Sequence, residues 1–125
     1  MKKIHSTNTA PAAIGPYSQA TSHNGTLYCS GQIPLDPKTM ELVGETAAEQ
    51  AEQVMKNLEA VLTEAGVDFS NVLKCTIFLA DMGDFGAVNE VYGARFKSEP
   101  PARETVAVKT LPKNVLVEIS CIAYL

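Results

Sequence analysis

The most strongly patterned segment of the chain is 46-TAAEQAEQVMKNLEAVLTEAG-66. Thr46 and Glu49 have the spacing of a capping box, in which the hydroxyl accepts a hydrogen bond from an exposed helix N–H and the glutamate reaches back to the cap. Gly66 is a residue type that commonly follows the last turn of a helix. The segment therefore predicts one long amphipathic helix. Its apolar face consists of residues at helical spacing: Ala47, Ala51, Val54, Met55, Leu58, Val61, Leu62 and Ala65.

The chain before this helix predicts a β-hairpin followed by a loop. Residues 17–21 and 26–30 are strand-like runs on either side of Asn24-Gly25, a dipeptide that strongly favours a hairpin turn. Residues 34–44 contain two prolines and a glycine, and we expect them to form a loop.

The chain after the helix predicts an alternating strand and a second helix. Residues 72–79 alternate as a half-buried strand requires. Asp84 is placed to cap the second helix, which two consecutive prolines, Pro100 and Pro101, bring to an end. The residues expected to face inward are Leu73, Cys75, Ile77 and Leu79 on the strand, and Phe85, Val88, Tyr92 and Phe96 on the helix.

The last third of the chain predicts a second hairpin. It has a strand over residues 103–110, a turn over 111–114 and a strand over 115–124. Because the buried face sets the register of a hairpin, the apolar alternation of both strands puts Arg103 and Glu118 together on the opposite face.

The order of these elements indicates the fold class. Strands, helix, strand, helix and hairpin are typical of an α+β fold, in which the two helices cover one face of the sheet. The chain has 125 residues and shows no internal repeat, so residues 1–125 are expected to form a single domain.

Composition and charge narrow the class of partner. The formal net charge is −4 and the ten Lys and Arg residues are scattered, so we expect no nucleic-acid partner, because phosphate binding needs clustered basic residues. Residues 1–13 lack the apolar region of a secretion signal, and no apolar run approaches the length of a membrane span. These features predict a cytoplasmic protein without membrane contact.

Three cysteines, Cys29, Cys75 and Cys121, each lie within an apolar run. An odd number of cysteines in a chain without an export signal argues against a disulfide framework. No C-x-x-C spacing or nearby histidine indicates a metal site. We therefore expect three buried thiols and no metal.

Arg103 and Glu118 are the strongest candidates for chemistry. An arginine held just after two prolines can bind a carboxylate through a bidentate pair of hydrogen bonds, and a glutamate on the same face can position or activate water. Thr105 and Ser30 are able to hydrogen-bond a polar substrate. The alternative is a salt bridge from Arg103 to Glu118 or Glu104 on an exposed sheet face, and the spacing alone favours this alternative.

Several separated motifs resemble those of one known family. Residues 101–106 (PARETV), followed by Leu111-Pro112 and by VEI at 117–119, are similar to the signature of the RidA/YjgF family. The resemblance covers nearly the whole chain. It extends to 10-APAAIGPYSQ-19, to 30-SGQIP-34, to residues 74–81 and to residues 84–92, which end in VNEVY.

The resemblance implies a chorismate-mutase-like fold of the YjgF type, assembled as a homotrimer with clefts between subunits. It also implies hydrolytic deamination of 2-aminoacrylate and 2-iminobutyrate, which are enamine and imine acids, to 2-keto acids and ammonia, without a cofactor. Pyridoxal-phosphate dehydratases release such compounds from serine and threonine, so a functional link to those enzymes is expected.

The resemblance also assigns roles to individual residues. In the family, the arginine that matches Arg103 clamps the substrate carboxylate, and the glutamate that matches Glu118 is proposed to orient the attacking water. The residues that line the same cleft match Tyr17, Ser30, Gly31 and Asn89 of this chain.

Two positions depart from the family pattern. Glu104 stands where the family usually has a small residue. Alternation points it away from the cleft side, where it can be tolerated, but a negative charge near Arg103 would weaken carboxylate binding. Thr105 stands where a cysteine is common, and it keeps a polar contact without a thiol.

Two further functions are compatible with the same sequence. One is a sensor that binds a small keto or amino acid without turnover, which would tolerate Glu118→Gln. The other is an interaction protein, either a holdase, which would be indifferent to Arg103→Ala, or a ribonuclease, which the acidic charge balance disfavours.

Overall fold

The Asn24-Gly25 turn has positive φ angles of 50° and 80°, the backbone conformation that a tight hairpin turn requires. In the computed structural model, which describes residues 1–125, this turn joins β2 (Ala20–His23) to β3 (Thr26–Gln32) in antiparallel pairing. A short N-terminal strand, β1 (Lys3–His5), pairs with the other edge of β2. The first predicted hairpin is therefore confirmed, although its first strand begins at Ala20 and not at residue 17.

The capping box forms as predicted and begins α1 (Ala47–Glu64). The Thr46 hydroxyl accepts from the Glu49 N–H at 3.2 Å, and the Glu49 carboxylate accepts from the Thr46 N–H at 3.0 Å. The chain leaves the helix through Gly66, whose φ of 85° is accessible to glycine at little cost. The predicted apolar stripe of α1 is buried against the sheet, so the long helix is confirmed.

β4 (Val72–Leu79) alternates as predicted except at its start. Its later odd-numbered residues are buried, whereas Leu73 is 50% exposed and Val72 is buried instead. The pairing of β4 with its antiparallel neighbour shifts between Val72 and Lys74. Such an irregularity exchanges inward and outward positions, so the expected inward position of Leu73 is wrong.

α2 (Phe85–Gly93) follows a short 3-10 turn that the Asp81 carboxylate begins. Asp84 makes no capping hydrogen bond, so its predicted role is wrong. The 3-10 turn leads directly into α2, and Asp84 therefore has helical rather than extended backbone angles, which its side chain would need in order to cap. Val88 and Tyr92 are buried as predicted.

The two C-terminal strands, β5 (Ala102–Ala107) and β6 (Val117–Tyr124), do not form the predicted hairpin. β4 lies between them, parallel to β5 and antiparallel to β6, in the sheet order β1-β2-β3-β6-β4-β5. β6 buries every second residue and has β3 and β4 as neighbours on its two sides. β5 is exposed along most of its length and lies at the sheet edge, a position that polar strands tolerate.

This strand order fixes which residues share a face. Cys75 of β4 pairs with Arg103 on one side and with Cys121 on the other. Because residues that lie directly opposite each other point to the same face, Arg103 faces the side of the sheet that carries the helices. Phe78 pairs with Glu118, which therefore points to the other side. The predicted shared face of Arg103 and Glu118 is wrong.

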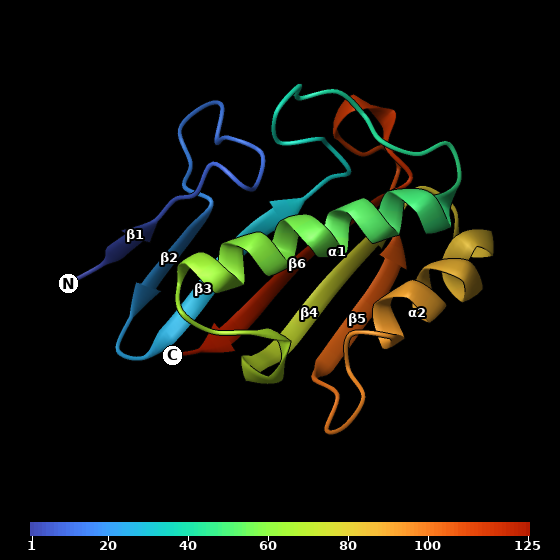
Figure 1. The fold of residues 1–125 in the computed structure, drawn as a ribbon. Coiled ribbons are helices and arrows are strands. Elements are labelled where there is room, and N and C mark those ends of the chain that lie inside the picture. The colour runs from blue at the N-terminus through green and yellow to red at the C-terminus, as the bar shows by residue number, and fades with distance from the viewer.

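The helices and the apolar core lie on one side of the sheet. Figure 1 shows α1 and α2 over the same face, whereas no helix covers the opposite face. On this open face Tyr28, Val106 and Tyr124 are 51%, 48% and 48% exposed. The predicted α+β fold, a mixed sheet with two helices on one face, is confirmed.

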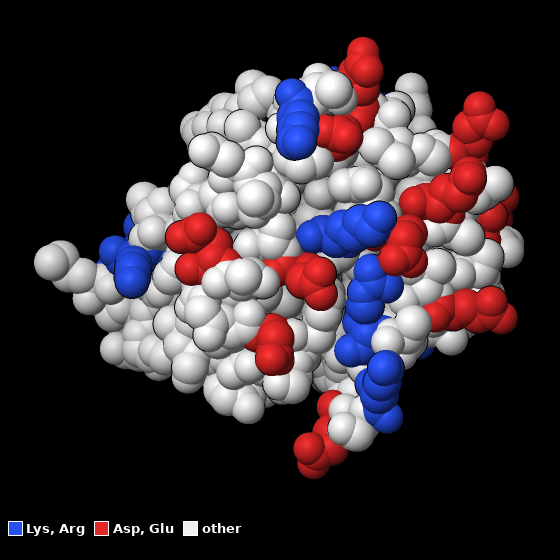
Figure 2. Space-filling view, viewed as in Figure 1, with Lys and Arg blue, Asp and Glu red and all other residues white.

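Charged side chains of both signs are interspersed over the helix-covered face (Figure 2). Where basic side chains gather, acidic ones flank them. Neither helix combines the length and the hydrophobicity that crossing a membrane requires. Besides these helices the chain has three 3-10 turns, at Phe69–Asn71, Met82–Asp84 and Pro112–Asn114.

Candidate active site

Arg103 is held by one face of α2. Its Nη1 donates to Asn89 Oδ1 at 2.5 Å, and its guanidinium carbon lies 5.3 Å from the ring centroid of Phe85 and 5.1 Å from that of Tyr92. These three residues follow the i, i+4, i+7 spacing of a single helix face. A cation over aromatic rings is attracted by their electron-rich faces, so the helix fixes the guanidinium in place without neutralising its charge.

No acidic side chain pairs with Arg103. The two ion pairs of the chain join Lys74 to Glu104 at 3.1 Å and Arg95 to Glu52 at 2.8 Å. The alternative prediction of a salt bridge from Arg103 to Glu118 or Glu104 is therefore wrong. Glu104 points to the opposite face, and the Lys74 ammonium offsets its charge. The guanidinium keeps its capacity to bind an external carboxylate.

Arg103 borders an open pocket of about 460 Å³. Thr105 lies on the same face of β5 as Arg103, two residues further along. The hydroxyls of Thr105 and Tyr92 are buried without a hydrogen-bond partner. An unpaired buried hydroxyl costs free energy, so the core beside Arg103 carries a cost that the rest of the fold offsets. The other residues lining the pocket are Asn89, Gly93, Phe96, Pro100 and Pro101.

A second polar group lies around Glu118, on the open face of the sheet. Glu118 is half-buried, and its carboxylate lies directly against the Cα of Gly31 on the neighbouring strand β3. A Cβ added to Gly31 would meet the Glu118 carboxyl carbon at 2.9 Å, so a larger residue there would displace the carboxylate from its present position. Burial raises the pKa of the Glu118 carboxyl above its usual range. A carboxyl with a raised pKa is better suited to exchange protons near neutral pH.

Ser30 organises this second group rather than offering a free hydroxyl. Its Oγ donates to the Ser18 carbonyl at 2.6 Å, and its N–H donates to the Gln19 carbonyl at 2.9 Å. The hydroxyl proton is therefore already used, and the Ser30 oxygen retains the capacity to accept a hydrogen bond. Through these bonds Ser30 holds the segment that carries Tyr17, whose side chain is 54% exposed.

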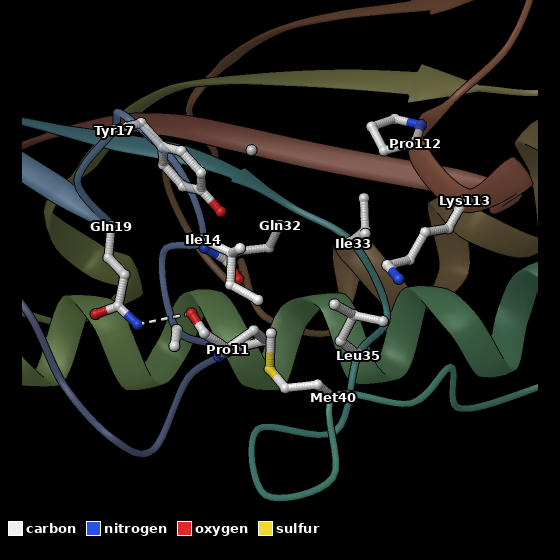
Figure 3. A pocket seen from close by; sticks show the side chains of 12 residues that line it. Pro11, Ile14, Tyr17, Gln19, Gln32, Ile33, Leu35, Met40, Pro112 and Lys113 are labelled. Atoms are coloured by element: carbon white, nitrogen blue, oxygen red, sulfur yellow. Dashed lines mark hydrogen bonds between the residues drawn. The ribbon is translucent and has the colours of Figure 1, made fainter.

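Tyr17 and Gly31 line a pocket of about 370 Å³ (Figure 3). It lies between the N-terminal segment, the end of β3, the loop that follows β3 and the 3-10 turn before β6. The side chains around it are mostly apolar. The lining residues that the sequence did not single out are Pro11, Ala12, Ile14, Gln19, Gln32, Ile33, Leu35, Met40, Pro112 and Lys113.

The structure thus places the predicted site residues in two groups. Arg103, Asn89 and Thr105 lie at the β5 edge on the helix-covered side, whereas Glu118 and Gly31 lie on the open side. Two strand spacings and three residues of offset separate the Cα atoms of Arg103 and Glu118 by roughly 14 Å. Their side chains also point to opposite faces, so a small substrate cannot contact both in one chain.

The three cysteines are free and buried, as predicted. Cys121 pairs across the sheet with both Cys29 and Cys75, so the thiols form one row beneath the helices. Burial raises the pKa of Cys75 to about 11, which keeps it protonated at neutral pH and makes it a poor nucleophile. No group of three or more His, Cys, Asp or Glu residues is arranged to hold a metal ion.

Sequence reasoning missed the aromatic support of Arg103 and the polar members of the second pocket. Phe85 and Tyr92 were interpreted only as core residues, although their spacing around Asn89 is the signal of a shared helix face. Gln32 and Lys113 gave no such signal, because their convergence depends on how two distant loops fold.

The fold and the two groups define a small α+β protein with an unneutralised, rigidly held arginine and a half-buried carboxylate. The Endoribonuclease L-PSP family matches residues 7–125. Protein DfrA of Myxococcus xanthus is 57% identical over 124 residues, which cover 98% of this chain and 94% of that protein. The 2-iminobutanoate/2-iminopropanoate deaminase of Mus musculus is 50% identical over 123 residues, covering 98% and 91%.

A solved structure gives the same result. The chain is 47% identical to a protein of unknown function of the Rid family from Yersinia pestis, with a TM-score of 0.98 and full coverage of both chains. This chain therefore belongs to the Endoribonuclease L-PSP family, which is the RidA/YjgF family that the sequence motifs resemble.

Proposed function

We propose that this chain hydrolyses 2-aminoacrylate and 2-iminobutyrate to 2-keto acids and ammonia. The observation that carries the proposal is Arg103, which is fixed by Asn89, Phe85 and Tyr92 and has no acidic partner. A rigid guanidinium with unused hydrogen-bonding capacity is suited to a small carboxylate substrate. The name of the mouse relative, 2-iminobutanoate/2-iminopropanoate deaminase, supports the same substrate class.

We further propose that the complete site forms between two copies of the chain, in a homotrimer. One copy contributes Arg103, Asn89 and Thr105, and the next contributes Glu118 and Gly31. The separation of these two groups within one chain supports this assembly, because both must reach the same small molecule. The half-exposed apolar side chains on the uncovered sheet face also favour burial against another copy.

The proposed reaction uses these groups in a defined order. Arg103 binds the substrate carboxylate and orients the C=N carbon, an enamine having first tautomerised to the imine. The imine reacts in its protonated form: Glu118 takes a proton from a water molecule while the water oxygen bonds to that carbon and the C=N electron pair passes to nitrogen, giving a neutral carbinolamine. Glu118 then returns this proton to the nitrogen, the C–N bond breaks and ammonia leaves, and the hydroxyl proton passes to solvent as the keto group forms.

The charge distribution supports a small-molecule substrate rather than RNA. The net charge is −4, and basic and acidic side chains are intermixed on the face shown in Figure 2. RNA binding relies on clustered basic residues or on stacking platforms that accept bases. The endoribonuclease activity in the family description is therefore not the function that we propose for this chain.

Arg103→Ala tests this proposal. A threonine dehydratase supplies 2-iminobutyrate, and the rate of 2-oxobutyrate release is measured with wild type and with the variant. Losing a charged bidentate pair is expected to reduce kcat/KM by about 100-fold. Glu104→Gln is the matched control, because Glu104 points to the other face and pairs with Lys74. If folded wild-type protein does not accelerate release, a metabolite sensor becomes the better interpretation.

A further inference from the structure

The pocket of Figure 3, which we call the Gln32–Lys113 pocket after two of its lining residues, contains an amide side chain that makes no hydrogen bond within the chain. Gln32 is only 6% exposed, and its amide points into the pocket. No hydrogen bond joins it to any other residue drawn there. Gln19, on the same pocket wall, differs: its amide donates to the carbonyl oxygens of Pro11 at 2.8 Å and Thr7 at 3.0 Å. The Gln32 amide therefore has hydrogen-bonding capacity that is open to a polar group entering the pocket.

The charge of the pocket is positive. The ammonium of Lys113 points inward between Ile33 and Leu35 (Figure 3), and Lys113 takes part in neither ion pair of the chain. None of the lining residues is acidic, although the chain as a whole carries a net charge of −4. An unpaired cation among donors, with no carboxylate nearby, favours an anionic group over a neutral one and repels a cationic one.

Between these polar groups the walls are apolar. Ile14, Ile33, Leu35 and Met40 line the middle of the pocket, and its volume of about 370 Å³ is within the range of small-ligand sites. Gly31 lies on the wall of this pocket and also against the Glu118 carboxylate. The pocket therefore borders the proposed reaction centre at Gly31, which is close enough for a side chain attached to the reacting carbon to reach it.

We propose that the Gln32–Lys113 pocket binds the substrate side chain and favours one that ends in a second carboxylate, so that the preferred substrate class is a 2-imino dicarboxylic acid. This inference rests on the proposed function. The reacting carbon lies beside Glu118, the methylene groups cross the apolar wall, and the terminal carboxylate accepts from the Lys113 ammonium and the Gln32 amide. The carboxylate next to the imine binds Arg103 of the adjacent copy.

The substrate preference is tested with 2-iminoglutarate and 2-iminobutyrate, which an amino-acid oxidase generates from glutamate and 2-aminobutyrate. Wild type is expected to favour 2-iminoglutarate in kcat/KM. In Lys113→Met the ratio of the two kcat/KM values is expected to fall about tenfold, mainly through KM for 2-iminoglutarate. Lys113→Arg, which keeps the positive charge, is expected to retain the wild-type ratio. Added salt is expected to lower the ratio of the wild type, because it screens the lysine charge. Lys56→Met, which removes the same charge from the exposed side of α1, serves as the control.

A binding measurement separates this inference from the proposed function. Calorimetric titration compares 2-oxoglutarate with 2-oxobutyrate on wild type, Lys113→Met and Gln32→Leu. Tighter binding of 2-oxoglutarate, lost in both variants, supports the pocket even if no imine is hydrolysed, in which case only the proposed function fails. The pocket assignment is wrong if both imines are hydrolysed and the dicarboxylic ligand is not preferred. It is also wrong if the preference for that ligand survives in Lys113→Met.

Discussion

At the scale of single residues, the contact between Glu118 and Gly31 constrains the chemistry most. The carboxylate occupies the space that a side chain at position 31 would fill, so the two residues are interdependent. Glu118 is half-buried and makes no ion pair, and burial raises its pKa. A half-buried carboxylate without a cationic partner destabilises the folded state. Such destabilising groups are typical of residues that are retained for function.

Glu118→Gln is predicted to stabilise the protein at neutral pH and to abolish hydrolysis. Because the folded pKa of Glu118 is raised, the folded state binds more protons, and stability from this group is lost as pH rises through that pKa. The variant should therefore exceed wild type in free energy of unfolding at pH 7. The difference should vanish below the ordinary glutamate pKa of about 4.3.

Urea unfolding of both proteins between pH 4 and pH 8 would measure this difference. A variant that is less stable than wild type at pH 7 would show that the carboxylate contributes to the fold, and the functional interpretation of its burial would then be wrong.

At the scale of elements, α2 acts as the support for the arginine. Asn89 hydrogen-bonds the guanidinium while Phe85 and Tyr92 lie beneath it, so one helix face sets its direction. The helix has nine residues and contains two glycines, so it depends on packing for its stability. The position of Arg103 therefore depends on the contact of α2 with the rest of the core.

Asn89→Asp is predicted to impair substrate binding more than Asn89→Ala. The aspartate would place a carboxylate against the guanidinium and compete with the substrate carboxylate for it. We expect KM for 2-iminobutyrate to rise about threefold to tenfold in Asn89→Ala, through loss of one hydrogen bond, and further in Asn89→Asp. Steady-state kinetics at fixed ionic strength would measure both. A lower KM in the aspartate variant would contradict the role of Arg103 as the carboxylate clamp.

The elements also show where sequence reasoning succeeded and failed. The capping box at Thr46 and the turn at Asn24 are local signals, because their hydrogen bonds join residues that are close in sequence, and both were predicted correctly. The pairing of β5 was predicted incorrectly, because alternation indicates which face is buried but not which strand lies alongside. Leu73 was misassigned because an irregularity in pairing has no signature in an alternating apolar run.

The difference between local and non-local signals also explains which features of the candidate site could be predicted. Arg103 and Glu118 were found from their residue types and from the family resemblance, whereas their placement in two groups follows from the non-local strand order. The support by Phe85 and Tyr92 was within reach of the helical periodicity. The convergence of Gln32 and Lys113 was not, since it brings a strand end and a turn 81 positions apart into one pocket.

At the scale of the whole molecule, the proposed homotrimer would account for both the uncovered sheet face and the divided site. A closed ring of identical subunits repeats one heterologous contact, so each Arg103 group would meet the Glu118 group of the next copy. The apolar side chains of the open face would be buried by the same contacts, which removes a surface that is unfavourable in water. Sedimentation of the purified protein would measure the oligomeric state on which this assembly depends.

Mixing two inactive variants is predicted to restore activity. Each Arg103→Ala chain keeps Glu118, and each Glu118→Gln chain keeps Arg103, so a cleft between unlike chains can contain both groups. With random assembly of equal amounts, about one quarter of the clefts would be intact, and the mixture should recover about that share of wild-type activity. Co-refolding the variants and measuring 2-oxobutyrate release tests this. The control is a mixture of Glu118→Gln with a chain that carries both substitutions, because no chain in that mixture has Glu118 and no cleft can be complete. If neither mixture shows activity, each site lies within one chain and the proposed assembly is wrong.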